Sequence, residues 1–209
     1  MRIGIVGAGR IGGNAARLFA RAGHELLLSY SRDQDKLARL AAEIGARAGT
    51  PRQAAQFGDV VMLSVPWTLV EQALGEAGPL DGTIVIDTTN QFGPGGLEAL
   101  GDRTAAQVNA ARMPGARYTK AFNTLTSGFQ AQAAGRTGPE RVAMFLCGDD
   151  EQAKQIVAGL IDDAGFTPVD LGGAADAAPM EPPRRPGAVY GEEVHEQEAR
   201  DLVARLRSS

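Results

Sequence analysis

The residues with the clearest chemical potential are three glycines near the start of the chain. They form the pattern G-x-G-x-x-G, as Gly7-Ala8-Gly9-Arg10-Ile11-Gly12, directly after the apolar run of residues 2–6. The first glycine of such a loop permits a tight turn, the second lets the backbone approach a pyrophosphate, and the third allows close helix packing. The following helix then offers free N–H groups to phosphate oxygens. A glycine-rich turn without a ligand is the alternative, but the placement between a strand and a helix favours a dinucleotide.

The end of the next apolar run bears on which dinucleotide would bind. A carboxylate at this place usually accepts hydrogen bonds from the ribose 2′-hydroxyl of NAD. Here residues 29–32 are Ser-Tyr-Ser-Arg, Lys36 follows, and the first carboxylate, Asp33, comes only after the strand. A guanidinium fits a 2′-phosphate, and such a charge-assisted bond contributes about 1.5–3 kcal/mol. Ser31, Arg32 and Lys36 therefore predict NADP(H), unless Arg32 and Lys36 are merely solvated helix charges.

No pair of side chains has the pattern of a general acid and base, so we expect hydride transfer by cofactor positioning, without a catalytic residue. His24 is expected to be structural, and His195 lacks the second histidine of a zinc-binding helix, so no metal site is predicted. Cys147 ends an apolar run and is expected in the core. Lys120, at a strand end, either acts at the cofactor rim or forms a salt bridge. Trp67 either lines the pocket or starts a helix.

A sheet must position these residues, and the chain alternates apolar runs of strand length with segments of helical periodicity. The first four runs are continuously apolar, as in strands buried on both faces of a parallel sheet. Strand–helix–strand alternation with right-handed crossovers predicts an α/β fold with a doubly wound, mostly parallel Rossmann sheet. The predicted strands cover residues 2–6, 25–30, 59–65, 83–87, 117–122, 141–147 and 166–170.

Two helices between these strands have well-marked ends. The first carries apolar residues at helical spacing from Ile11 to Ala22 and is expected to stop at Gly23. The second runs from about residue 153 to 164. It is preceded by Asp149, with Gln152 three residues later, which predicts a capping box.

The chain changes character after residue 171, so the NADP-binding Rossmann domain is expected to cover residues 1–171. Residues 171–187 contain four prolines and no periodic apolar set, which predicts an extended arm, followed by a last helix over about residues 191–206. Residues 172–209 would thus form a C-terminal arm and helix rather than an independent domain. Because long structureless stretches are usually functional, we expect a homodimer in which the arm or last helix covers the partner's cofactor mouth.

The arm also contains two neighbouring arginines, Arg184 and Arg185. A guanidinium pair could contact a phosphate group or an acidic acceptor. The alternative is an exposed pair in a linker.

The composition excludes several functional classes. The 209 residues carry a formal net charge of −4, which argues against a nucleic-acid partner. The opening MRIGIVGAG is too short and too glycine-rich for a signal peptide or a membrane span. The single cysteine excludes an internal disulfide, so we expect a cytoplasmic protein without a membrane partner.

Taken together, the motifs resemble those of the NADPH-dependent reductases of the deazaflavin coenzyme F420 and of the small dinucleotide-binding oxidoreductases related to them. The resemblance spans residues 1 to about 172. The motifs that carry it are Gly7–Gly12, Ser31-Arg32-x-x-x-Lys36, Val65-Pro66-Trp67, Lys120-Ala121-Phe122-Asn123-Thr124 and Cys147-Gly148-Asp149-Asp150.

The resemblance implies that NADPH lies across the carboxyl ends of the strands, with the deazaflavin near the nicotinamide. It places residues 64–66 at the ribose and nicotinamide, Ala121 beside the nicotinamide, and residues 87–90 on the same rim. The stretch after Asn90 and the tail from Pro179 to Gly191 differ from this family, so the second substrate is expected there. The residues expected to bind the cofactor are Gly7, Ala8, Gly9, Arg10, Ile11, Gly12, Ser31, Arg32, Lys36, Ser64, Val65, Pro66, Thr88, Asn90 and Ala121.

The leading hypothesis is an NADP(H)-dependent oxidoreductase that transfers a hydride between NADPH and a flavin-like acceptor. Coenzyme F420 is the first candidate for this co-substrate, and a flavin is the other. A dehydrogenase or reductase of a small hydroxy acid, carbonyl or imine normally carries a large helical second domain, whereas only 38 residues follow position 171 here. A third hypothesis is an NADP-binding, redox-sensing module without turnover.

Overall fold

The computed structural model describes residues 1–29 and 33–207, with side chains up to residue 205. Within these residues eight strands form one sheet in the order β10-β9-β8-β5-β4-β1-β2-β3. All neighbours are parallel except β8 and β9, so the predicted mostly parallel, doubly wound sheet is confirmed. The strands are β1 (Arg2–Val6), β2 (Glu25–Ser29), β3 (Arg47–Ala48), β4 (Val60–Leu63), β5 (Ile84–Asp87), β8 (Arg117–Ala121), β9 (Ala143–Cys147) and β10 (Thr167–Asp170).

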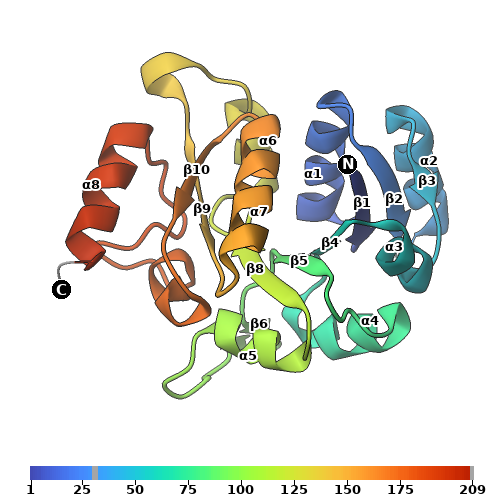
Figure 1. Ribbon diagram of the computed structural model, residues 1–209, viewed down its shortest axis with the longest axis horizontal. Helices are drawn as coiled ribbons and strands as arrows, with labels where there is room; N and C mark the ends of the chain where they lie inside the picture. Colours follow the sequence, from blue (N-terminus) through green and yellow to red (C-terminus); the bar gives the residue numbers. More distant parts are fainter. Residues whose placement is uncertain (30–32, 208–209) are drawn as a thin grey trace.

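Helices cover both faces of this sheet, as Figure 1 shows. Successive strand residues point to opposite faces, so the continuous apolar runs bury side chains on both sides. Ile3 and Ile5 of β1 pack into one core, and Val6 packs into the other. The first core includes side chains of α1 (Arg10–Arg21), α2 (Gln34–Ile44), α6 (Ser127–Ala133) and α7 (Glu151–Asp163). The second includes those of α3 (Pro51–Phe57), α4 (Val70–Ala77), α5 (Ala105–Arg112) and α8 (Glu196–Arg207).

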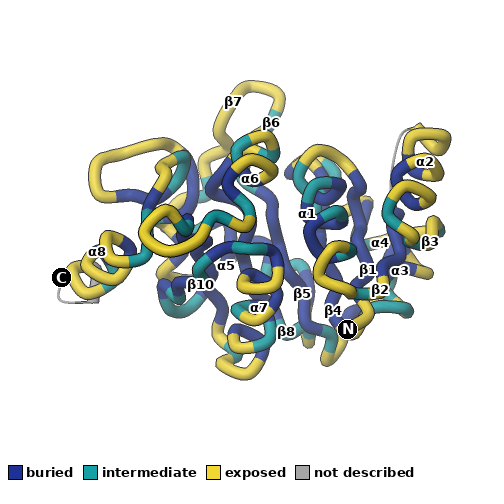
Figure 2. The backbone as a smooth tube through the Cα atoms, turned by 90° about the horizontal axis from the view of Figure 1, so that it is seen from above, coloured by how far each residue is buried: buried dark blue, intermediate teal, exposed yellow. Residues whose placement is uncertain are grey.

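The strands therefore form a buried central layer, dark blue in Figure 2, between helices whose outer faces are exposed. Three very short strands are not predicted by the sequence pattern. One is β3 at the sheet edge, and the others are β6 (Phe92–Gly93) and β7 (Gly96–Leu97), which form a separate hairpin. A strand of two residues is too short to show an alternating pattern of apolar and polar side chains. None of the described helices has the length and apolar character needed to cross a membrane.

The predicted capping box of the second marked helix is wrong by one residue. The N-cap of α7 is Asp150, whose side chain accepts a hydrogen bond from the backbone N–H of Ala153 at 2.9 Å. Asp150 is held there by Arg117 on β8, at 2.6 Å. Asp149 instead accepts from the backbone N–H of Ala174 at 2.9 Å. A tertiary contact thus decides between two adjacent aspartates that the local sequence does not distinguish.

The predicted extended arm over residues 171–187 is wrong in part, because residues 174–180 are helical while residues 181–187 contain no helix or strand. Residues 174–180 form a 3₁₀ helix, η3 (Ala174–Met180), which packs against the second core. Its buried residues Ala174, Ala177 and Met180 recur every three positions, the repeat of a 3₁₀ helix rather than of an α-helix. The last helix begins at Glu196 rather than near residue 191, and its Ala199 and Leu202 are buried. The domain boundary at residue 171 stays a prediction.

Candidate active site

The glycine loop lies where β1 passes into α1, and its backbone leaves no room for side chains at two of the three glycines. Gly7 has a φ of +112°, and a Cβ there would lie 2.2 Å from the carbonyl oxygen of Ser64. A Cβ on Gly12 would lie 2.1 Å from the carbonyl oxygen of Gly7. At Gly9, by contrast, nothing lies within 4 Å of the added carbon. The loop is therefore packed tightly on its inner side and open at Gly9, which fits the approach of a pyrophosphate.

A groove of about 370 Å³ runs along the outside of this loop. It is lined by Ala8, Gly9 and Arg10 of the loop and by Lys36 and Arg39 of α2; with Arg17, four cationic residues border it. The residues that complete its lining are Arg17, Leu40 and Glu43.

The one carboxylate that lines this groove, Glu43, is paired with Arg17 at 2.7 Å. The hydrogen bond from Arg17 holds the pKa of the Glu43 carboxyl below its usual value. The carboxylate of Asp33 also has a partner: Asp33 is the N-cap of α2 and accepts a hydrogen bond from the backbone N–H of Lys36 at 2.8 Å. Ser31 and Arg32, predicted to bind a 2′-phosphate, lie outside the described residues.

A second and larger hollow, of about 700 Å³, lies at the carboxyl ends of the central strands. It begins at Ile11, the residue after Arg10, so the groove and this cleft border on consecutive residues of one loop. Of the residues predicted on the rim, Thr88 and Asn90 line it. The others that line it are Asn123, Thr124, Leu125, Thr126, Phe129, Arg184, Tyr190, Gly191, Glu192 and Glu193.

Four further predicted residues do not line the cleft. Ser64 contacts Thr88, whose hydroxyl donates to its Oγ at 3.0 Å. Val65 is buried, and Pro66 is exposed ahead of the 3₁₀ turn Trp67–Leu69. Ala121 is fully buried in the first core, so a ligand in the cleft would contact Asn123 and Thr124 rather than Ala121.

Two amide side chains form the floor of the cleft. The Nδ2 of Asn90 donates to the backbone carbonyl of Asn123 at 2.9 Å, and the Nδ2 of Asn123 donates to Oδ1 of Asn90 at 3.0 Å. Asn123 also donates to the carbonyl of Met180 at 2.6 Å. Its Oδ1 and the hydroxyl of Thr124 are buried without a hydrogen-bond partner among the described residues. Since buried polar atoms are normally satisfied, this floor suits a polar ligand group.

The backbone next to this floor is in an uncommon conformation. Phe122 has a φ of +60°, in the left-handed region that costs a residue other than glycine about 1–3 kcal/mol. Its ring packs edge to face on Phe19, with centroids 5.7 Å apart. Its carbonyl accepts from the amide of Gln130 at 3.1 Å. These contacts hold a sharp bend after β8, and the bend brings Asn123 and Thr124 to the cleft.

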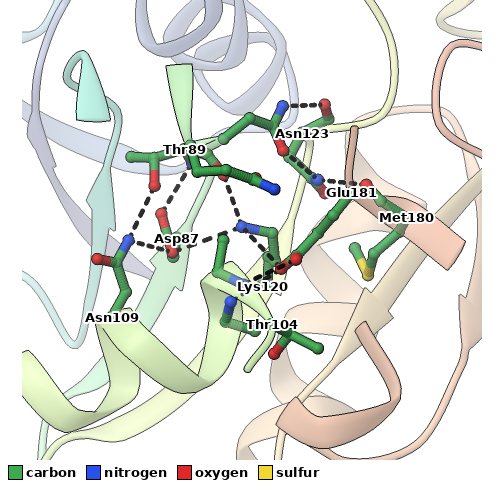
Figure 3. A network of polar contacts seen from close by, with 12 residues as sticks. Asp87, Thr89, Thr104, Asn109, Lys120, Asn123, Met180 and Glu181 are labelled. Carbon is green, nitrogen blue, oxygen red and sulfur yellow. Dashed lines mark hydrogen bonds and ion pairs between the residues drawn. The ribbon is translucent and has the colours of Figure 1, made fainter. Parts of the chain in front are cut away.

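Below the floor lies a buried network of charged and polar side chains, drawn in Figure 3. Lys120 is fully buried and lies 3.7 Å from Asp87 and 3.6 Å from Glu181. Its ammonium group donates to the carbonyl of Thr89 at 2.6 Å. Asp87 also accepts from the hydroxyl of Tyr118 at 2.7 Å. Of the two interpretations left open for Lys120, the structure has the salt bridge, since Lys120 does not line the cleft.

The same burial affects the titratable side chains around Asp87. Desolvation, followed by the charge of Asp87, raises the pKa of the Tyr118 hydroxyl well above its usual value. Desolvation likewise raises the pKa of the Cys147 thiol to about 12, which fits the predicted core position.

The other candidate residues have structural contacts. His24 packs edge to face on Phe19 and lies 3.1 Å from Asp163. His195 follows the buried Val194 just before α8 and lies 3.6 Å from Glu193. Trp67 is buried, and its ring N–H donates to Glu98 at 2.7 Å. It begins the 3₁₀ turn and does not line the cleft.

The two arm arginines differ in their surroundings. Arg184 lines the cleft and lies 3.3 Å from Glu192. Arg185 is exposed and donates to backbone carbonyls, among them those of Ala178 and Glu181.

Sequence reasoning missed most of the cleft wall. Asn123 and Thr124 stood within a motif that was noted, but only Ala121 was assigned to the site from it. Tyr190 lies in the tail from Pro179 to Gly191, where the second substrate is expected, whereas Glu192 and Glu193 have no local pattern and reach the cleft through tertiary packing. These residues line the cleft of their own chain. The sequence analysis predicts instead that the arm or the last helix covers the cofactor mouth of a partner chain.

A glycine loop at the start of α1, at the point where the strand order reverses around β1 and β4, is the arrangement of a dinucleotide-binding Rossmann fold. Residues 2–91 match the model of the family described as NADP oxidoreductase, coenzyme F420-dependent. A solved hypothetical protein from Sinorhizobium meliloti is 31% identical, with 94% of this chain and 95% of that chain covered and a TM-score of 0.82. Residues 2–91 therefore form a domain of this family of NADP-dependent oxidoreductases, and the protein from Sinorhizobium meliloti is similar over nearly the whole chain.

Other proteins are similar at lower identity. A proposed F420-dependent NADP reductase from Arthrobacter sp. FB24 is 24% identical over 85% of this chain and 87% of its own, with a TM-score of 0.74. The metalloreductase STEAP3 from Rattus norvegicus is 29% identical over 86% of this chain, which spans 36% of that relative's length. A reductive aminase from Aspergillus terreus, solved with NADPH, is 23% identical over 85% of this chain and 56% of its own, with a TM-score of 0.62.

Proposed function

We propose that this protein binds NADPH along the groove and cleft and transfers its hydride to a flavin-like acceptor, with coenzyme F420 the first candidate. The observation that carries the proposal is that the two hollows border on consecutive residues of the glycine loop. Arg10 lines the groove and Ile11 lines the cleft, so a dinucleotide whose pyrophosphate lies at Gly9 can place its two halves on either side. When bound, NADPH supplies the hydride from its nicotinamide ring.

The charges of the groove support a preference for the phosphorylated dinucleotide. Arg10, Lys36 and Arg39 border the groove, and Arg32 lies in the sequence between β2 and the N-cap Asp33. The nearest carboxylates, Asp33 and Glu43, are committed to the start of α2 and to Arg17, so they are poorly available to a ribose hydroxyl. Cations without a competing carboxylate favour a 2′-phosphate.

The residues of the cleft supply both apolar and polar surface for a planar acceptor. Ile11, Leu125 and Phe129 supply apolar surface, while Asn90, Asn123 and Thr124 supply polar atoms at the floor. Such a lining binds and orients two ring systems and excludes water, which is what hydride transfer between them requires. A flavin-like acceptor fits this mixed lining better than a small hydroxy acid.

The direct test mixes the purified protein and NADPH with coenzyme F420, FMN, FAD or a ferric chelate and follows the loss of nicotinamide absorbance. The ferric chelate is included because one relative is a metalloreductase. We expect turnover with at least one flavin-like acceptor. Tight NADPH binding without turnover by any acceptor would contradict the proposed reaction and favour a redox-sensing module. Turnover with cyclic imines or ketones alone would point to the carbonyl or imine reductase.

A further inference from the structure

Residues 180–193 form one wall of the cleft, and a single buried carboxylate anchors its start. Glu181 is 3% exposed, directly after η3. Its two oxygens accept from the backbone N–H groups of Ala105 and Ala106, each at 2.8 Å, at the amino end of α5. Its Oε1 also lies 3.6 Å from the ammonium group of Lys120. The carboxylate thus joins the C-terminal segment to α5 and to β8 at once.

The residue before Glu181 connects this anchor to the cleft floor. The carbonyl of Met180 accepts the 2.6 Å hydrogen bond from Asn123, whose amide also holds Asn90. Figure 3 shows Glu181, Met180 and Asn123 in continuous contact above Lys120. A shift of Glu181 would move the Met180 carbonyl and release the amide of Asn123.

The residues after Glu181 make the rest of the wall. The backbone N–H of Gly191 donates to the carbonyl of Thr124 at 2.8 Å, and Glu193 accepts from Arg136 at 2.7 Å. Arg184, Tyr190 and Glu192 line the cleft between these points. The contact of Glu193 is exposed, whereas the carboxylate of Glu181 is buried in the network of Lys120 and Asp87.

This wall borders only one of the two hollows. The groove beside Gly9 is lined by residues of the glycine loop, α1 and α2 and includes none from residues 180–193. The wall should therefore affect what binds beside the nicotinamide end and leave the dinucleotide's pyrophosphate and 2′-phosphate contacts intact.

We propose that Glu181, paired with Lys120, is a positioning residue for the acceptor site: it fixes the cleft wall and, through Met180, the amide of Asn123. The proposal rests on the proposed hydride transfer for its acceptor and on the described contacts for its geometry. Neither residue touches a ligand, so they act through Asn123 and the wall.

The test is Glu181→Gln, which keeps the size of the side chain and removes its charge. We expect the KM for FMN, or for whichever acceptor turns over, to rise about tenfold, while the Kd for NADPH changes less than about twofold. Amide hydrogen exchange over residues 182–193 should become faster. Glu198→Gln, the same change at an exposed position of α8, is the control and should alter none of these values.

A second variant covers the case in which Glu181→Gln fails to fold. The double change Lys120→Met with Glu181→Gln removes the buried ammonium group together with the charge of Glu181. Asp87 keeps its hydrogen bonds from Thr89, Asn109 and Tyr118. This variant should also show faster exchange over residues 182–193 and the raised acceptor KM. Unchanged exchange there in the variants that fold would overturn the proposal, as would parallel losses of NADPH and acceptor binding. A wild-type protein that turns over no acceptor would instead refute the proposed reaction, and exchange alone would then decide the role of Glu181.

Discussion

Asn90 and Asn123, which follow neighbouring strands of the sheet, hold each other through two hydrogen bonds of 2.9 and 3.0 Å. In one the side chain of Asn90 donates to the backbone of Asn123, and in the other the two side chains meet. The pair fixes the orientation of the Asn123 amide, so that its Oδ1 is left without a partner among the described residues. This arrangement makes the cleft floor sensitive to small chemical changes.

The first prediction concerns this pair. Asn90→Asp removes the donor to the carbonyl of Asn123 and places a negative charge against it, so we expect kcat/KM for NADPH oxidation to fall about tenfold. Steady-state kinetics with FMN would measure the loss. Gln132→Glu, the same chemical change at an exposed position of α6, is the control. Equal kinetics for Asn90→Asp and the control would contradict this role for the floor.

The glycine loop allows a comparison of two alanine substitutions. A Cβ on Gly12 would lie 2.1 Å from the Gly7 carbonyl, so Gly12→Ala should destabilise the protein by about 1–3 kcal/mol and weaken NADPH binding. Gly75, within α4, has nothing within 4 Å of an added carbon, and Gly75→Ala should stabilise by about 0.5–1 kcal/mol. Urea unfolding of both variants measures the difference. If Gly12→Ala were as stable as Gly75→Ala, the packing of the loop would be wrong.

Cys147 provides a test of the buried network. Burial raises the pKa of its thiol from 9.0 to about 12, so at pH 8 the folded protein should hold about a thousandfold less thiolate than an exposed cysteine. We expect almost no reaction with a thiol reagent until the protein is unfolded in guanidinium, when one thiol should react. Because only the unfolded chain ionises near its ordinary pKa, this thiol also makes the free energy of unfolding decrease as the pH rises above 9.0. Rapid labelling of the folded protein at pH 8 would contradict the structure around β9.

Asp150, the N-cap of α7, should make the free energy of unfolding depend on pH in the acid range. The hydrogen bond from Arg117 holds the pKa of its carboxyl well below the ordinary value of 3.8. A lowered pKa contributes stability that is complete above the ordinary value and is lost as the pH falls towards the folded-state pKa. The stability difference between the wild type and Asp150→Asn should therefore be largest near neutral pH and shrink below pH 3.8.

Chemical denaturation of the two proteins at a series of pH values would measure this difference. The same substitution in an Arg117→Ala background should show a smaller effect, because the main cause of the pKa shift is removed. A difference that stayed constant into strong acid would rule out the ion pair as its source.

The features that depend on neighbouring residues in the chain could be predicted from the sequence. The glycine loop, the seven longer strands and the absence of a carboxylate at the end of β2 all depend on residues that are neighbours in the chain. The tail from Pro179 to Gly191 is expected near the second substrate, but the individual contacts of Glu181 and Tyr190 could not be predicted, since they depend on packing against α5 and against the bend after β8. The η3 segment was missed because its apolar residues repeat every three positions, between the periods of strands and α-helices.

The homodimer and the cytoplasmic location stay predictions. The wall at residues 180–193 reduces one reason to expect a dimer, since its residues line the cleft of their own chain. Light scattering at micromolar concentration would decide the oligomeric state.

The account depends most on the binding of a phosphorylated dinucleotide across the groove and the cleft. Isothermal titration of the purified protein with NADPH and with NADH tests it directly. We expect NADPH to bind about tenfold or more tightly than NADH, and Arg32→Ala to remove most of that preference while changing NADH affinity less than about twofold. An absence of binding heat with NADPH, or equal losses for both dinucleotides in Arg32→Ala, would contradict the account.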